Sequence, residues 1–217
     1  MTQLIIFDMD GIIFDSEQLY MRFLKLVMKR YNYCLTKNQY ISTLGLTDSA
    51  TKARMLELFG LDFSYDKIYL EAKQEMMNYI DKKNIPLKQG ILELLDFLNA
   101  NKFKIAIASS TNKDVILYYL QKANITHCFD IIVGGDEIKH SKPHPEIFLK
   151  ACSIAKTDPS MALVLEDSPN GLLAAINAKI PVICIPDLKF PPQEIVDKCH
   201  AIVRSANEVI NLIKKDI

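Results

Sequence analysis

The chain has 217 residues, with 26 basic and 26 acidic side chains and therefore no formal net charge at pH 7. This length suits one large domain or a core with a smaller inserted domain. The balanced charge offers no basic surface for nucleic acid or for an anionic membrane. No apolar run reaches the ~18 residues that a membrane-spanning helix needs. We therefore expect a protein that binds neither nucleic acid nor membrane.

The cysteines and the start of the chain indicate a compartment. Five cysteines occur, an odd number without any C-x-x-C pair, which favours reduced intracellular thiols over a disulfide framework or a zinc site. The first apolar run begins almost at once, without the charged-then-apolar layout of a signal peptide. We expect a cytoplasmic protein, and a monomer.

The first predicted element is the apolar run Leu4–Phe7, followed directly by Asp8-Met9-Asp10-Gly11. A continuous apolar run predicts a strand buried on both faces, as in a parallel sheet. Side chains alternate along an extended chain, so residues 8 and 10 project on the same side. Two acids at the end of such a strand are costly unless they meet a cation or take part in chemistry. The alternative is a polar loop whose acids face water.

Almost ninety residues follow without a convincing strand. Leu19, Phe23 and Val27 have helical spacing, and Asp15 or Ser16 can cap that helix. Further helices are predicted near 37–43, 48–59 and 65–81, ending before Pro86. We interpret residues 16–85 as a helical cap domain inserted into a core of residues 1–15 and 86–217.

After the insert, strands and helices alternate. Apolar, β-rich runs predict strands at 104–108, 131–133, 162–165, 182–185 and, more weakly, 202–203. Helical patterns lie between most of them, at 87–99, 112–122, 145–155 and 171–178. Alternating strands and helices predict an α/β fold with a doubly wound (Rossmann-like) parallel sheet, here with an inserted helical-bundle cap.

Three polar clusters stand near the predicted strand ends. Each has a simple structural interpretation: an ordinary helix N-cap, a solvated surface lysine and a capped loop. Together they would converge with the first two acids in one crevice, because ligands of open α/β sheets bind at the carboxyl ends of the strands. The clusters are Ser109-Ser110-Thr111-Asn112, Lys142 within Ser141-Lys142-Pro143, and Glu166-Asp167.

Four carboxylates crowded into one crevice repel each other strongly unless a divalent cation lies between them. Oxygen ligands suit Mg²⁺, which commonly takes another ligand from a substrate phosphate. Hydroxyls, a helix start and one lysine complete a phosphate site. The constellation therefore predicts Mg²⁺-dependent phosphoryl transfer on a small-molecule phosphoester.

These residues carry a close resemblance to a known family. Asp8-Met9-Asp10-Gly11, Ser109, Lys142 before Pro143, and Glu166-Asp167 resemble the four ordered motifs of the haloacid dehalogenase superfamily. The stretch Gly11–Glu17 is similar to the subgroup with a helical cap after the first strand, which contains β-phosphoglucomutase and many sugar-phosphate phosphatases. The resemblance covers essentially the whole chain.

The resemblance implies roles for the motif residues. Asp8 would be the nucleophile that forms an aspartyl phosphate, and Asp10 would act as general acid and then general base. Two groups of residues complete the implied site. Mg²⁺ would be held by Asp8, the backbone carbonyl of Asp10, and Asp167, with Glu166 nearby. The phosphoryl group would be bound by Ser109, Ser110, Asn112 and Lys142.

Within this subgroup the sequence favours hydrolysis over the mutase reaction. The mutase uses a histidine and an arginine of the cap to engage the sugar and its second phosphate, where this chain has Tyr20 and Asp48. An acid in place of a cation would repel that phosphate. Glu17 and the stretch Gly45–Asp48 are our candidates for substrate selection. A β-phosphoglucomutase-type phosphotransferase remains the alternative.

A second alternative is a receiver-like phospho-switch module, which also places acids, a hydroxyl and a lysine around Mg²⁺. The length of the chain, the large insert and the position of Asp10 count against it. Asp10 would hasten loss of phosphate, whereas a switch must retain it.

Overall fold

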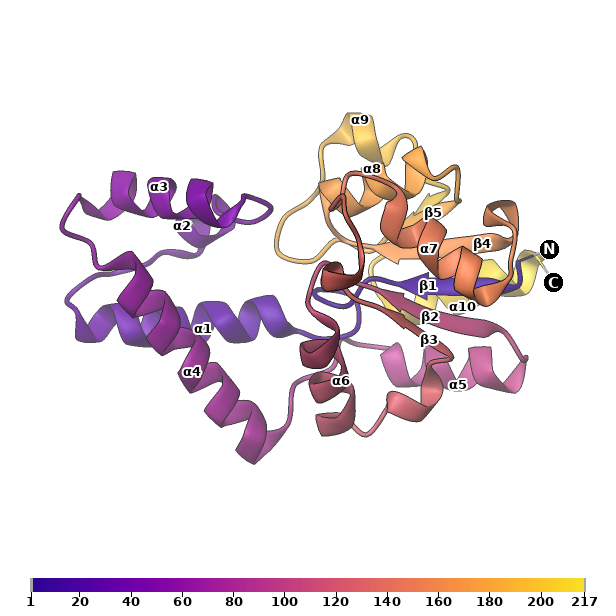
Figure 1. Ribbon diagram of the computed structural model, residues 1–217, viewed down its shortest axis with the longest axis horizontal. Helices are drawn as coiled ribbons and strands as arrows, with labels where there is room; N and C mark the ends of the chain where they lie inside the picture. Colours follow the sequence, from indigo (N-terminus) through magenta and orange to yellow (C-terminus); the bar gives the residue numbers. More distant parts are fainter. Residues whose placement is uncertain (1, 217) are drawn as a thin grey trace. The chain divides into compact units, whose positions relative to one another are not determined.

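The computed structural model describes residues 2–216, which divide into two units. One unit runs to Asp15 and resumes at Ile85, and the other spans Ser16–Asn84. Figure 1 shows the first unit built on a sheet and the second built of helices. The insert expected from the sequence was 16–85, so Ile85 differs: its side chain is buried and belongs to the sheet unit.

Six strands of the described residues form one parallel sheet in the order β3-β2-β1-β4-β5-β6. The central strand β1 pairs with β2 on one side and β4 on the other, with Phe7 opposite Ile107 and Leu165. This arrangement confirms the predicted doubly wound α/β fold. The strands are β1 Leu4–Phe7, β2 Lys104–Ala108, β3 Ile131–Val133, β4 Ala162–Glu166, β5 Val182–Cys184 and β6 Ala201–Ile202.

Helices cover both faces of the sheet, as a parallel sheet requires. Leu4 and Ile6 of β1 lie in one core cluster with Phe148 of α7 (Glu146–Ala155) and Leu172 of α8 (Pro169–Asn177). Helices α5 and α10 pack against each other, and α5 contacts β2; Figure 1 shows α5 on the side of the sheet opposite α7 and α8. All four residues of β1 are fully buried. Burying each large apolar side chain contributes about 1.5–3 kcal/mol.

Four helices of the sheet unit follow the expected ranges within a few residues, and two more, the short helix Gln193–Val196 and the helix Ala206–Asp216, were not expected. In the second of these, Ala206, Val209 and Ile213 are nevertheless buried at helical spacing. The helices of this unit are α5 Ile91–Ala100, α6 Lys113–Lys122, α7 Glu146–Ala155, α8 Pro169–Asn177, α9 Gln193–Val196 and α10 Ala206–Asp216, with 3₁₀ turns at Thr126–Cys128, Gly135–Glu137 and Pro159–Met161.

The inserted unit contains α1 Ser16–Arg30, α2 Lys37–Ile41, α3 Asp48–Phe59 and α4 Tyr65–Lys83. Thr36 and Gln39 form a capping box that begins α2. Helices α1 and α4 pack along each other, with the rings of Phe23 and Tyr79 5.5 Å apart and an ion pair between Arg30 and Glu71. The long α1–α4 contact is the main packing of this unit.

Backbone hydrogen bonds join the two segments in which the chain passes from one unit to the other. The amide of Asp15 donates to the carbonyl of Pro86 at 2.9 Å, and the amide of Lys88 donates to the carbonyl of Ile13 at 2.9 Å. Phe14 and Leu87 form an antiparallel bridge between these bonds. The end of the first segment and the start of the second are therefore fixed to each other inside the sheet unit.

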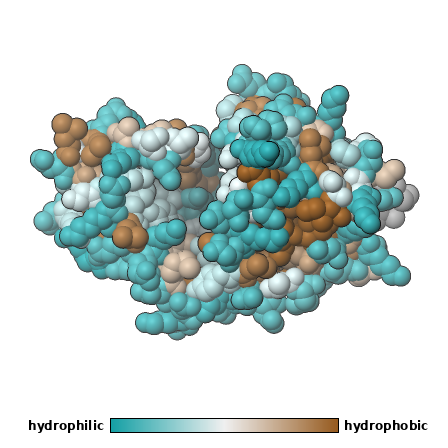
Figure 2. Space-filling model, in the orientation of Figure 1, coloured by the Kyte–Doolittle hydropathy of each residue, from teal (hydrophilic) through white to brown (hydrophobic). Residues whose placement is uncertain are grey.

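The surface in view is largely hydrophilic. Figure 2 shows hydrophobic atoms gathered over the part of the sheet unit where α7 lies. Leu149 and Ile154 of that helix are partly exposed. No helix within residues 2–216 combines the length and apolar character needed to cross a membrane.

Candidate active site

The site begins at the carboxyl end of β1, in the centre of the sheet. The amide of Asp8 donates to the carbonyl of Leu165 at 3.0 Å, which continues the β1–β4 pairing and directs the chain into the crevice. The Asp8 side chain is buried. Gly11 follows with φ of +80°, and a Cβ at this position would lie 2.6 Å from Oδ2 of Asp167. Glycine therefore lets the loop after β1 approach the acid at the end of β4.

Lys142 joins two of the acids directly. Its Nζ donates to Oδ1 of Asp8 at 2.5 Å and to Oε1 of Glu166 at 2.8 Å. The Lys142 side chain is only 5% exposed, and its Nζ also lies 4.9 Å from the centre of the Phe148 ring. The peptide bond between Lys142 and Pro143 is cis. A surface lysine was the alternative interpretation of this position, and its burial is incompatible with that.

Glu166 is held rigidly at the end of β4. Its Oε2 accepts from the amide of Ser168 at 2.8 Å and from the Ser168 hydroxyl at 3.0 Å, and its side chain is fully buried. A Cβ on Gly171, in the first turn of α8, would overlap the Glu166 carboxylate. The carboxylate thus fills the space that a larger residue at position 171 would need.

Asp10 and the predicted phosphate loop meet through a residue that the sequence did not single out. The Thr111 hydroxyl donates to Oδ2 of Asp10 at 2.9 Å, and the Thr111 amide donates to Oγ of Ser109 at 3.1 Å. Ser109 is buried, whereas Ser110 and Asn112 are exposed. The loop therefore offers one enclosed hydroxyl beside Asp10 and two polar side chains that face solvent.

The electrostatics of the site reflect crowded, buried acids. Burial raises the pKa of Asp8 to about 7, opposed by the ammonium of Lys142 and reinforced by Glu166 and Asp10. Burial, followed by Glu166 and Asp8, also raises the pKa of Asp167 well above its ordinary value. Although burial alone would lower the pKa of Lys142, Asp8 and Glu166 raise it, so this lysine is charged at neutral pH.

The donor set of the crevice fits a hard divalent cation. Asp187, on the loop after β5, also raises the pKa of Asp167. Its Oδ1 accepts from Lys88 at 2.6 Å, while its Oδ2 is buried without a hydrogen-bond partner among the described residues. The acids Asp8, Asp10, Glu166, Asp167 and Asp187 outnumber the two lysines that contact members of this group, Lys142 and Lys88, and every side-chain ligand atom that they offer is an oxygen. Such a set suits Mg²⁺ and is costly without positive charge.

The structure therefore brings together most of the residues predicted from the sequence. Asp8, Glu166 and Lys142 are in direct contact, Asp167 lies against Gly11, and Asp10 is linked to the loop at Ser109. Three supporting residues were missed. Thr111 belongs to one of the polar clusters and Ser168 directly follows another, which was a signal for them, whereas nothing in the pattern singled out Asp187.

Two predicted residues, Glu17 and Gly45, belong to the inserted unit. Oε2 of Glu17 accepts from the hydroxyl of Tyr40 at 2.6 Å. Gly45 has φ of +81°, and a Cβ there would have nothing within 4 Å. A role for either residue in substrate selection stays a prediction.

Comparison with known proteins identifies the family of this chain. A family model described as haloacid dehalogenase-like hydrolase matches residues 5–185. The chain is 30% identical over 179 residues to a phosphorylated carbohydrates phosphatase of Thermotoga maritima, with 81% of each chain covered. It is 26% identical over 189 residues to hexitol phosphatase B of Escherichia coli K12, covering 83% of this chain and 82% of the relative. A solved β-phosphoglucomutase from Clostridium difficile has the same fold, with a TM-score of 0.74, 24% identity and coverage of 99% and 96%.

Proposed function

The chain belongs to the haloacid dehalogenase-like hydrolases and is a phosphatase, and we propose that it hydrolyses a small phosphomonoester of the sugar-phosphate class with the help of Mg²⁺. Two of its relatives are named for phosphorylated carbohydrates and hexitols. Membership of this family argues against the receiver-like alternative. The observation that best supports the chemistry is the contact of Lys142 with both Asp8 and Glu166 at the carboxyl end of the central strand.

Asp8 is the proposed nucleophile. One of its carboxylate oxygens forms a bond to the substrate phosphorus while the bond from phosphorus to the leaving oxygen breaks. Lys142, held 2.5 Å from Oδ1 of Asp8, carries positive charge where the phosphoryl oxygens would arrive. The enclosed hydroxyl of Ser109 would donate to one of these oxygens, and the exposed side chains of Ser110 and Asn112 would reach the outer ones.

Asp10 is the proposed acid and base. Its carboxyl gives a proton to the leaving oxygen in the first step and takes one from water in the second. That water attacks phosphorus, the bond to Asp8 breaks, and inorganic phosphate leaves with the Asp8 carboxylate restored. The Thr111 hydroxyl holds Oδ2 of Asp10 and so orients the other oxygen for proton transfer.

The proposed Mg²⁺ ligands are Asp8, the backbone carbonyl of Asp10, and Asp167, with Glu166 in support. When bound, the ion neutralises charge on the acids and on the transferring phosphoryl group. Phosphatases of this superfamily generally use a metal ion, and the oxygen-only donor set favours magnesium.

Hydrolysis is favoured over the mutase reaction by the residues of the inserted unit. Tyr20 is neutral because burial, the largest cause, raises its pKa. Asp48 begins α3 and has an acidic side chain. Neither can supply the cation that would hold the second phosphate of a bisphosphate intermediate.

Phosphate release from a panel of sugar phosphates, nucleotides and small phosphoesters tests the proposal. We expect release with Mg²⁺, none with chelator, and recovery when Mg²⁺ is added back. Asp8→Asn should lower turnover at least about 10³-fold and abolish acid-stable labelling of the protein by ³²P substrate. Asp62→Asn, at an exposed position, is the matched control. Full turnover by Asp8→Asn would contradict the assignment of Asp8 as the nucleophile. If the protein converted β-glucose 1-phosphate to glucose 6-phosphate faster than it released phosphate, that result would favour the mutase reaction.

A further inference from the structure

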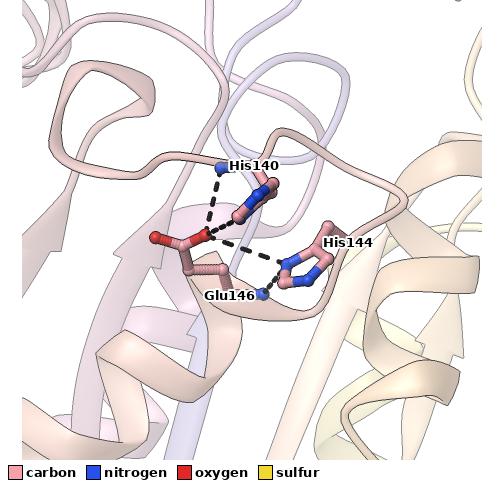
Figure 3. A group of neighbouring side chains, drawn as sticks. All are labelled: His140, His144 and Glu146. Carbon is pink, nitrogen blue, oxygen red and sulfur yellow. Dashed lines mark hydrogen bonds and ion pairs between the residues drawn. The ribbon is translucent and has the colours of Figure 1, made fainter.

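Three side chains converge on the outer side of the loop that carries Lys142. His140, His144 and Glu146 lie within seven residues of sequence, and Figure 3 shows both imidazole rings turned toward one carboxylate oxygen. Nδ1 of His140 lies 2.8 Å from Oε2 of Glu146, and Nδ1 of His144 lies 3.8 Å from the same oxygen. One ligand atom from each residue lies within 4.8 Å of the other two.

This combination is a metal-binding set of a different kind from the acids around Asp8. Two imidazoles and one carboxylate suit Zn²⁺ and its first-row neighbours, whereas Mg²⁺ prefers oxygen ligands. Bonds of about 2.0–2.2 Å place tetrahedral ligands about 3.3 Å apart. The distances from Oε2 of Glu146 to Nδ1 of His140 and of His144, 2.8 Å and 3.8 Å, lie on either side of this value.

The carboxylate is already fixed in position. Oε1 of Glu146 accepts from the amide of Lys139 at 2.9 Å, and Oε2 accepts from the amide of His140 at 3.0 Å. These bonds hold the start of α7 against the loop, so one of the three ligands needs no ordering when an ion binds. A preorganised ligand of this kind lowers the entropic cost of binding.

The rings remain accessible to an ion from solvent. The side chains of His140 and His144 are 64% and 49% exposed, so water can complete the coordination. Lys142 lies between them in sequence, but its side chain points inward and is 5% exposed. The loop therefore presents an acid-binding lysine on one side and an imidazole pair on the other.

We propose that His140, His144 and Glu146 form a binding site for a divalent cation of the zinc class, separate from the carboxylates around Asp8. The bound ion joins residues on both sides of Lys142 and so fixes the ends of the loop that presents this lysine. The simpler interpretation is a hydrogen bond between His140 and Glu146 that braces the loop and binds no metal.

Calorimetric titration of the tag-free protein with Zn²⁺, in millimolar Mg²⁺ to occupy the oxygen site, tests the proposal. We expect one Zn²⁺ per chain and a visible absorption spectrum typical of nitrogen ligands when Co²⁺ replaces it. His140→Ala and His144→Ala should each weaken Zn²⁺ binding at least tenfold, because each removes a ligand. His127→Ala and His200→Ala, at exposed positions elsewhere, are matched controls and should leave binding unchanged.

Two further measurements separate this site from the acidic crevice and from a folding defect. Asp8→Asn should retain the Zn²⁺ binding, since it alters only the oxygen site. Circular dichroism of His144→Ala should match the parent protein, because the His144 side chain is 49% exposed and the bond that it accepts from the Glu146 amide is long, at 3.3 Å. Zn²⁺ binding that is absent, that persists in both histidine variants, or that is lost in Asp8→Asn would overturn the proposal.

Discussion

Removal of the charge on Asp8 should change how the stability of the metal-free protein depends on pH. The Asp8 pKa is raised from 3.8 to about 7, mainly by burial. Between these values the folded chain holds a proton that the unfolded chain has lost. Stability from this group is therefore full below about pH 4 and declines as the pH rises toward about 7. Asp8→Asn has no such proton and lacks this decline.

The size of the effect follows from the difference between the two pKa values. Each pH unit of difference corresponds to about 1.4 kcal/mol, so the shift of Asp8 represents up to about 4 kcal/mol. The free energy of unfolding of Asp8→Asn, relative to the parent protein, should therefore increase by up to that amount between about pH 4 and about pH 8. Mg²⁺ should reduce the difference, because a bound cation favours the ionised carboxylate.

Urea unfolding followed by far-UV circular dichroism measures this difference in the free energy of unfolding, since the chain has no tryptophan for a fluorescence assay. The two proteins are compared in chelator across the pH range, with Asp62→Asn as a control for the change in net charge. If the free energies of unfolding of the parent and Asp8→Asn changed in parallel with pH in chelator, the raised pKa of Asp8 would be refuted. That result would mean that Asp8 is not buried among acids when metal is absent.

Three other substitutions test the supporting residues. Lys142→Met should destabilise the metal-free protein at about pH 8 by about 3–5 kcal/mol in urea unfolding, because two buried carboxylates lose their partner; unchanged stability would contradict the contact. Gly171→Ala should cost about 1–3 kcal/mol in the same assay despite the better helix propensity of alanine, since the methyl group overlaps Glu166. Thr111→Val should lower kcat about tenfold, which corresponds to a rise of about 1.4 kcal/mol in the activation free energy, while Thr111→Ser should retain the parent kcat. Equal kcat values for Thr111→Val and the parent would show that Thr111 does not position Asp10.

Much of the fold could be predicted because buried parallel strands have a simple sequence pattern. Leu4–Phe7 is a continuous apolar run, Lys104–Ala108 is apolar from Ile105 onward, and both are strands with the predicted bounds. Parallel strands end at the same edge of the sheet, so polar residues that follow them must come together. This rule was enough to expect Lys142 and Glu166 near Asp8.

Other features depend on contacts that no local pattern reports. Thr111 is one hydroxyl within a polar run, and only the geometry of the turn after β2 shows that it, rather than Ser110, reaches Asp10. Asp187 lies on the loop after β5, and the 2.6 Å hydrogen bond from Nζ of Lys88 to its Oδ1 joins residues that are 99 positions apart in sequence. His140 and His144 lie on an irregular loop and Glu146 begins α7, so neither helical nor strand periodicity predicts that these three side chains face each other.

The hydrogen bond from Asp15 to Pro86 has a consequence for how proteins of this architecture diversify. The segments that enter and leave the inserted helices are joined by this bond, so the length and composition of the insert can change without shifting the strand that precedes Asp8. The inserted unit and the sheet unit can thus vary independently of each other in evolution. A graft of foreign helices between these two anchor points would inherit the same reaction centre.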